Sequence, residues 1–359
     1  MERVKEMIDY LFNFEKRIIS PIWDGEKAME FMCLGYNEFA EALNFKLCKN
    51  SDKVVGIDEN ELINPNNVEC LRDRSLNPST VKEELDHVDK LKKTIKVLFG
   101  GGFFGPLTVA GTLVGMENFN KYIVKNPDFV ESVMDFVTKQ MIYLAKEEEK
   151  HGIDFLWIAE PVASLLSPKS FEKFCGVYLK RIFDSIKVPG FLHVCGKTLK
   201  HTNAMVKTGA KLLSIDYVTD IEKCIRIVPD DVIIMGNINP MLLKYGDKQE
   251  IINETIRINE ACKNYKNFIF STGCILPEGT PKENVELAID TTENFKIWTN
   301  EEYIYLRNLI KALVNDDKSS ETIKDEIELL KQSNEINKNL IDVAFEEVQK
   351  IRQYSKELM

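Results

Sequence analysis

The sequence predicts an α/β fold of the (β/α)8 barrel (TIM barrel) type, with an N-terminal helical segment and a C-terminal helical extension. Short apolar runs alternate with segments of helical periodicity along most of the 359 residues, and repeated strand–helix units imply a parallel sheet with crossover helices. Polar residues follow directly after several of these runs. Because the carboxyl ends of barrel strands converge on one mouth, where functional groups gather, this placement favours a barrel over an open sheet.

The expected elements run along the chain as follows. Residues 1–45 have a helical pattern that is interrupted at Ser20-Pro21 and near Gly35. We interpret seven apolar runs as strands: 53–57, 95–99, 155–159, 188–194, 212–215, 232–235 and 268–271. Apolar residues at helical spacing and helix-starting residues predict helices from 107, over 128–149, from 168, over 204–207, from 220, and over 248–264, 283–294 and 301–314.

The domain organisation expected is one barrel domain over residues 1–318, including its N-terminal helices, followed by a helical extension over 319–359. The extension is charged, lacks glycine, and carries apolar residues at helical spacing. It fits either a solvated helix or a surface through which the protein forms a homo-oligomer.

Composition excludes several classes of protein. No stretch approaches the ~20 consecutive apolar residues of a membrane span, and residues 1–17 do not resemble a signal peptide, so we expect a cytoplasmic protein that does not bind membranes. The net charge of -10 disfavours nucleic acid as a partner, because that partner requires clustered Lys and Arg. The eight cysteines are irregularly spaced, which argues against a disulfide framework.

A candidate metal site follows two of the predicted strands. His193 and Cys195 lie two residues apart, so that in extended backbone they face the same side. Cys274 follows another apolar run after a glycine. Each residue alone fits a structural role, but one nitrogen and two sulfurs together form a zinc set with an open position, whereas Mg²⁺ and Ca²⁺ prefer oxygen ligands.

Two carboxylates follow strands and are further candidates for catalytic residues. Asp216 could be a fourth metal ligand or a partner of His193, and a residue that caps the following turn fits equally well. Glu160 is expected to point into the barrel mouth, although an ordinary loop carboxylate remains an equal alternative. Glu147, Glu148 and Glu149, by contrast, are interpreted as the solvated end of a helix.

A glycine-rich stretch at residues 100–105 formally matches the G-x-G-x-x-G pattern of dinucleotide sites. Such a site requires the next strand after a single helix, and the next apolar run begins only near residue 155, so we disfavour it. We expect a glycine-rich loop that lets a planar ligand or a partner approach the backbone. Gly101, Gly102 and Gly105, with Asn237 at another strand end, are the candidate cofactor-binding residues.

Five motifs follow one another along the chain: Phe104 to Gly111, Glu160 to Pro168, His193 to Gly196, Gly236 to Pro240, and Gly273 to Pro281. In series they resemble those of the uroporphyrinogen decarboxylase superfamily, and within it the corrinoid-dependent branch of the methylcobamide:coenzyme M methyltransferase type. The resemblance covers about residues 95–314.

The resemblance implies a (β/α)8 barrel, and its methyltransferase branch implies zinc held by His193, Cys195 and Cys274, with a carboxylate that can occupy the fourth position falling near Asp216. It implies methyl transfer between a protein-bound corrinoid (cobalamin type) and a small methyl donor or acceptor, with a thiol as first candidate. A corrinoid protein is then the expected partner.

Two other functions stay open. The decarboxylase branch grips its polycarboxylate substrate with an arginine-rich N-terminal segment, whereas residues 1–50 contain only Arg3 and Arg17. A metal-free decarboxylase is therefore disfavoured. A non-catalytic corrinoid- or tetrapyrrole-binding protein is the third possibility.

Overall fold

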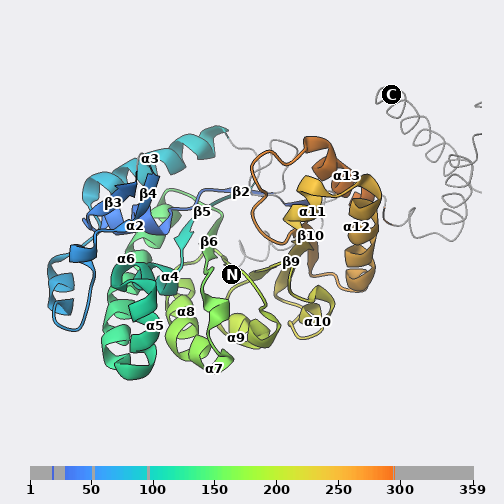
Figure 1. Ribbon diagram of the computed structural model, residues 1–359. Coiled ribbons are helices and arrows are strands. Elements are labelled where there is room, and N and C mark those ends of the chain that lie inside the picture. The colour runs from blue at the N-terminus through green and yellow to red at the C-terminus, as the bar shows by residue number, and fades with distance from the viewer. Residues whose placement is uncertain (1–17, 20–28, 51–52, 95–97, 294, 296–359) are drawn as a thin grey trace, which may run out of the picture. The chain divides into compact units, whose positions relative to one another are not determined.

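The computed structural model describes residues 18–19, 29–50, 53–94, 98–293 and 295. At its centre lies a parallel sheet of eight strands in the order β1-β10-β9-β8-β7-β6-β5-β2 (Figure 1). These strands are β1 (Ile18–Ile19), β2 (Met29–Phe31), β5 (Leu98–Phe104), β6 (Phe155–Ala159), β7 (Gly190–Val194), β8 (Leu212–Ile215), β9 (Ile233–Ile238) and β10 (Phe268–Thr272). The expected α/β fold with a parallel sheet is confirmed.

Helices connect the strands and, in Figure 1, lie along the outer side of the curved sheet. They are α2 (Tyr36–Ala42), α3 (Pro78–Thr94), α4 (Pro106–Val114), α5 (Met116–Lys125), α6 (Pro127–Lys150), α7 (Pro168–Phe171), α8 (Val177–Asp184), α9 (Thr202–Lys207), α10 (Ile221–Ile225), α11 (Pro240–Tyr245), α12 (Lys248–Cys262) and α13 (Lys282–Glu293). Short 3₁₀ turns occupy Glu59–Glu61, Val68–Asp73, Ala163–Leu165 and Leu199–His201, and a π-helical turn joins α7 to α8 at Glu172–Gly176.

Helix boundaries follow local sequence signals. Pro127 at the first position of α6 and the Asn126 side chain, which accepts from the Phe129 N–H, start that helix. At the start of α12, Asp247 and Glu250 form a reciprocal capping box. The expected helices over 128–149 and 248–264 are therefore confirmed to within two residues.

Alternation along the strands separates the two faces of the sheet. A cluster of buried side chains fills one face, which we call the inner face: Phe155, Trp157, Phe191, Leu212, Ile233, Met235 and Ile269. Because successive strand residues point to opposite faces, the residues between them, such as Leu156 and Leu192, face the helices. The inner face therefore carries an apolar core toward the amino ends of the strands and, two residues further on, the residues of the site.

Three parts of the chain differ from the sequence-based expectation. Within the expected N-terminal helical segment, residues 29–31 form strand β2, paired with residues 98–100 of β5, and residues 18–19 form β1. Strands this short leave no period-two signal, so backbone pairing decides their conformation. Residues 53–57 are a strand as expected, but β4 (Lys53–Ile57) pairs with β3 (Leu47–Asn50) in a separate antiparallel hairpin.

The chain divides into two compact units, residues 1–286 and 287–359, and almost all described residues belong to the first. The expected helix over 301–314 and the expected extension over 319–359 lie outside the described residues. Within the part that is described, no helix has the length and apolar character needed to cross a membrane.

Candidate metal centre

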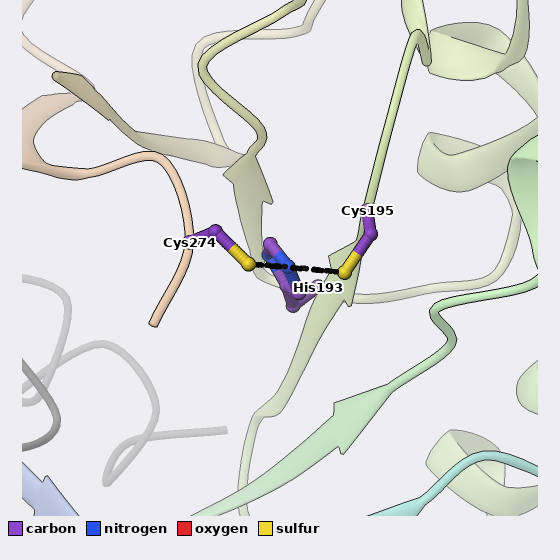
Figure 2. A group of neighbouring side chains, drawn as sticks. All are labelled: His193, Cys195 and Cys274. Atoms are coloured by element: carbon purple, nitrogen blue, oxygen red, sulfur yellow. Dashed lines mark hydrogen bonds between the residues drawn. The ribbon is translucent and has the colours of Figure 1, made fainter. Parts of the chain in front are cut away.

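His193, Cys195 and Cys274 converge at the carboxyl ends of β7 and β10, as Figure 2 shows. The Nε2 atom of His193 lies 3.2 Å from Cys195 Sγ and 3.9 Å from Cys274 Sγ. The two sulfurs are 3.9 Å apart, far longer than the ~2.05 Å of a disulfide, and all eight cysteines are free. Among the described residues these three form the one group of His, Cys and acidic side chains compact enough to hold a metal ion.

The arrangement fits zinc. Zn–S bonds of about 2.3 Å and Zn–N bonds of about 2.0–2.1 Å separate the ligand atoms of a tetrahedral site by about 3.6–3.8 Å. The measured separations of 3.2–3.9 Å bracket these values. One imidazole and two thiols are habitual zinc ligands, and three protein ligands leave the fourth position open. His193, Cys195 and Cys274 are therefore the residues that would hold the ion.

Ser214 orients the imidazole. It lies on β8 directly opposite His193 in the parallel register, and its Oγ is 3.0 Å from His193 Nδ1. We assign the proton to Nδ1, which donates to Ser214 and leaves the Nε2 lone pair facing the sulfurs. The Trp157 ring stacks on the imidazole at 6.4 Å between centroids and 16° between planes, so His193 is held from two sides.

The two cysteine sulfurs interact with each other. They lie within hydrogen-bond distance, and either atom can be the donor. Hydrogen bonding with Cys195 lowers the pKa of Cys274, and the same hydrogen bond, together with burial, raises the pKa of Cys195. Metal binding requires deprotonated sulfurs, and the lowered pKa of Cys274 favours that state for one of the two.

Asp216 and Asn237 support the loops around the ligands. The Asp216 carboxylate accepts from the backbone N–H groups of Gly196, at 2.7 Å, and Val218, at 3.1 Å. The Asn237 amide donates to the carbonyl oxygens of Asp216 and Thr219. Asp216 is not part of the compact ligand group; the structure shows the turn-capping role, and a ligand role for Asp216 stays a prediction.

Glu160 does not point into the strand mouth as expected. Its carboxylate is fully buried and accepts from the backbone N–H groups of Leu107 and Thr108, at 2.8 and 3.0 Å, and from the Thr108 hydroxyl at 2.6 Å. These donors belong to the first turn of α4, where a negative charge is favourable. Glu160 therefore fixes a helix to the sheet. Its backbone N–H donates to the carbonyl oxygen of His193 at 2.8 Å, but its carboxylate is not part of the compact ligand group, and a catalytic role for Glu160 stays a prediction.

The expectation of a glycine-rich loop is wrong, because residues 98–104 are the strand β5. Glycine is needed there for close packing: a Cβ on Gly101 would lie 2.5 Å from the Glu148 carboxylate, and one on Gly102 would lie 1.9 Å from the Trp157 carbonyl oxygen. Gly105 precedes α4 and packs against Glu160 in the same way. The chain's own atoms thus occupy the space beside these glycines, and a cofactor-binding role for them stays an untested prediction.

A cavity of about 210 Å³ adjoins the metal ligands on the inner face. His193 and Cys274 form part of its wall, and the rest is mainly apolar: Cys33, Phe104, Trp157, Ala159, Ser214, Met235, Ser271, Thr272 and Ile275. A larger hollow of about 380 Å³ between α6 and residues 68–74 contains none of the ligands. The cavity beside the ligands is therefore the candidate substrate site.

Sequence reasoning missed Ser214 and Trp157. A signal for Ser214 was present, since it interrupts the apolar run Leu212–Ile215 two residues before Asp216, on the face that carries the site. Trp157 offered no such signal, because an aromatic residue in an apolar strand is more often core. Only the register of β6 beside β7 places it next to His193.

Comparisons with known proteins give a family match, several relatives and a structural neighbour. The sequence model of the family described as uroporphyrinogen decarboxylase (URO-D) matches residues 29–295. The chain is 27% identical over 263 residues to a uroporphyrinogen decarboxylase of Prochlorococcus marinus (68% of this chain, 72% of the relative), and 27% identical over 242 residues to a methylcobamide:CoM methyltransferase of Methanosarcina acetivorans (65% and 69%). A methyltransferase structure from Methanosarcina mazei superposes with a TM-score of 0.61 at 24% identity, over 72% of this chain and 77% of that one, which shows a shared fold. The family match spans well over half of the sequence, and this chain therefore belongs to the uroporphyrinogen decarboxylase family.

Proposed function

We propose that the protein is a zinc-dependent methyltransferase that moves a methyl group between a corrinoid and a small substrate, with a thiol as first candidate. The observation that carries the proposal is the convergence of His193, Cys195 and Cys274 on one point beside a cavity. Similarity to both decarboxylases and methylcobamide:CoM methyltransferases leaves the reaction open, and the ligand set favours methyl transfer.

Zinc bound at this position would supply Lewis acidity that lowers the pKa of a substrate thiol and makes it nucleophilic near neutral pH. His193, held by Ser214 and Trp157, presents its Nε2 atom in a fixed direction. The apolar wall of the cavity excludes water and orients the substrate for an in-line approach.

The transfer balances without any further reagent. The substrate sulfur attacks the methyl carbon on the corrinoid, a carbon–sulfur bond forms, and the cobalt–carbon bond breaks with its electron pair left on cobalt. The thiol proton leaves to solvent. The reverse reaction, in which Co(I) removes a methyl group from a methylated substrate, uses the same residues.

A corrinoid protein is the proposed partner, since a relative is named for its methylcobamide substrate. We also infer that the parallel sheet closes into a (β/α)8 barrel: β1 and β2 are neighbours in the chain and stand at the two ends of the strand order, as rolling the sheet would require. The mouth of that barrel is where the corrinoid would approach.

Decarboxylation remains the second candidate, because the matched relatives include uroporphyrinogen decarboxylases. Decarboxylation does not require a metal site with two cysteine ligands. Conversion of uroporphyrinogen to coproporphyrinogen by the purified protein would establish it in place of methyl transfer.

Metal analysis tests the proposal. The wild-type protein is expected to hold about one zinc per chain and to demethylate methylcobalamin in the presence of a thiol, and Cys195→Ser and Cys274→Ser to lose most of both. Cys70→Ser, at an exposed cysteine that is not part of the group, is the matched control and should retain zinc and activity. Full zinc and activity in both ligand variants would refute the metal site.

A further inference from the structure

The side chains that line the cavity beside the metal ligands indicate the kind of substrate it accepts. The proposed function does not specify that substrate. Most of the described wall consists of apolar side chains from four segments: Phe104 at the end of β5, Trp157 on β6, Met235 on β9 and Ile275 after β10. Burying apolar groups against such a wall is favourable because it removes apolar surface from water. The wall therefore favours an apolar substituent.

The polar groups in the wall are few and uncharged. Ser214 already bonds to His193, and Ser271 and Thr272 add two further hydroxyls. Cys33 is a neutral thiol, because burial and the nearby Glu148 raise its pKa to about 12. Apart from the metal ligands, no Lys, Arg, Asp, Glu or His among the described residues lines the cavity.

This lining disfavours a charged substituent. Burying an ion beside apolar atoms without a partner is unfavourable, whereas burying a neutral alkyl or aryl group there is favourable. The volume of about 210 Å³ is below the ~300 Å³ lower bound of pockets for drug-sized ligands, so the cavity suits a small substrate.

We propose, on the basis of the proposed function, that the small substrate is a neutral compound with a compact apolar substituent. Its sulfur faces His193, Cys195 and Cys274, and its substituent lies against Phe104, Trp157, Met235 and Ile275. Thiols that carry a carboxylate or an ammonium group near the sulfur are discriminated against.

The test compares three thiols of similar length: propanethiol, mercaptoacetate and 2-aminoethanethiol. Binding is measured on the full-length Co(II)-substituted protein through the change in its thiolate-to-metal absorption, and turnover on the zinc protein as methylcobalamin demethylation. We expect propanethiol to bind and react at least about tenfold better than either charged thiol. Equal or better binding of a charged thiol overturns the proposal.

The two readouts separate this inference from the proposed function. Preferred binding of propanethiol without methyl transfer supports the cavity assignment and refutes the proposed reaction. Methyl transfer that prefers a charged thiol supports the reaction and refutes the cavity assignment. Absence of binding by all three thiols overturns the cavity assignment as well.

A charge placed on the wall should reverse the preference. Ile275 is 61% exposed, so Ile275→Arg can be accommodated without refolding, and it should shift selectivity toward mercaptoacetate by about tenfold. Ile227→Arg adds the same charge at a position that is 41% exposed and does not line the cavity, and should leave selectivity unchanged. An unchanged preference in Ile275→Arg contradicts the assignment of this wall.

Discussion

Two fully buried glutamates show how differently the same side chain is used in this fold. Glu160, after β6, accepts three hydrogen bonds from Leu107 and Thr108. Glu148, near the end of α6, has no hydrogen-bond partner for either oxygen among the described residues, and Glu84 lies nearby. Burial raises the pKa of Glu160 to about 7 against the opposing effect of its donors, and burial together with Glu84 raises the pKa of Glu148 well above its usual value. A buried carboxylate therefore stabilises the surrounding structure only where hydrogen-bond donors lie beside it.

Removing the bonded carboxylate should have the largest effect on stability. Glu160→Ala leaves two N–H groups and a hydroxyl at the buried start of α4 without their acceptor, which is expected to lower the free energy of unfolding by about 3 kcal/mol. Urea denaturation at pH 7 measures this loss. Glu172→Ala, which removes an exposed glutamate paired with Lys207, should cost less than about 0.5 kcal/mol. Equal small losses in both variants would contradict the structural role of Glu160.

The two glutamates also mark where sequence reasoning ends. Glu160 was expected to face the mouth and Glu148 to be solvated, and the structure reverses the exposure of Glu148 and redirects Glu160. Both outcomes depend on how a helix packs on the sheet: Glu148 lies over Gly101 and Glu160 beside Gly105. Such contacts join residues about 50 positions apart and leave no periodic signal in the sequence.

The metal ligands, by contrast, were predictable because their placement follows from strand alternation. His193 and Cys195 are two residues apart at a strand end, and Cys274 follows a parallel strand of the same sheet. Where an apolar run of four or more residues sets the register, the strand was found, and in β6 and β10 its end was found to within one residue, whereas β9 continues three residues past the expected end at 235. The three-residue strand β2 and the glycine-rich β5 lack such a run and were not recognised as they are.

A hydrogen-bond partner is equally important at the metal site. Removing Ser214, the partner of His193, should have the second largest effect, a loss of metal affinity. Ser214→Ala removes the acceptor for His193 Nδ1, which frees the ring to rotate and to change tautomer. Loss of such a partner typically lowers metal affinity about ten- to a hundredfold. Competition for zinc against a chromophoric chelator measures the change, and Ser132→Ala on the exposed face of α6 is the control. Unchanged affinity in Ser214→Ala would show that Trp157 alone holds the imidazole.

Glu148, which has no hydrogen-bond partner among the described residues, should make the free energy of unfolding depend on pH. For one such group the dependence is at most about 1.4 kcal/mol per pH unit. A carboxyl whose pKa is raised on folding contributes stability that is complete below its unfolded pKa, about 4.3, and is lost as pH rises toward the folded pKa. Glu148→Gln removes this titration, so its unfolding free energy should fall less steeply than that of the wild type between pH 5 and pH 8. Glu160, whose pKa is raised to about 7, contributes a loss of its own that is nearly complete by pH 8 and is the same in Glu148→Gln and the wild type. Urea denaturation across this pH range measures the difference, with Glu222→Gln at an exposed position as the control. Parallel curves of unfolding free energy against pH for Glu148→Gln and the wild type would contradict the prediction and mean that Glu148 gains a hydrogen-bond donor in solution.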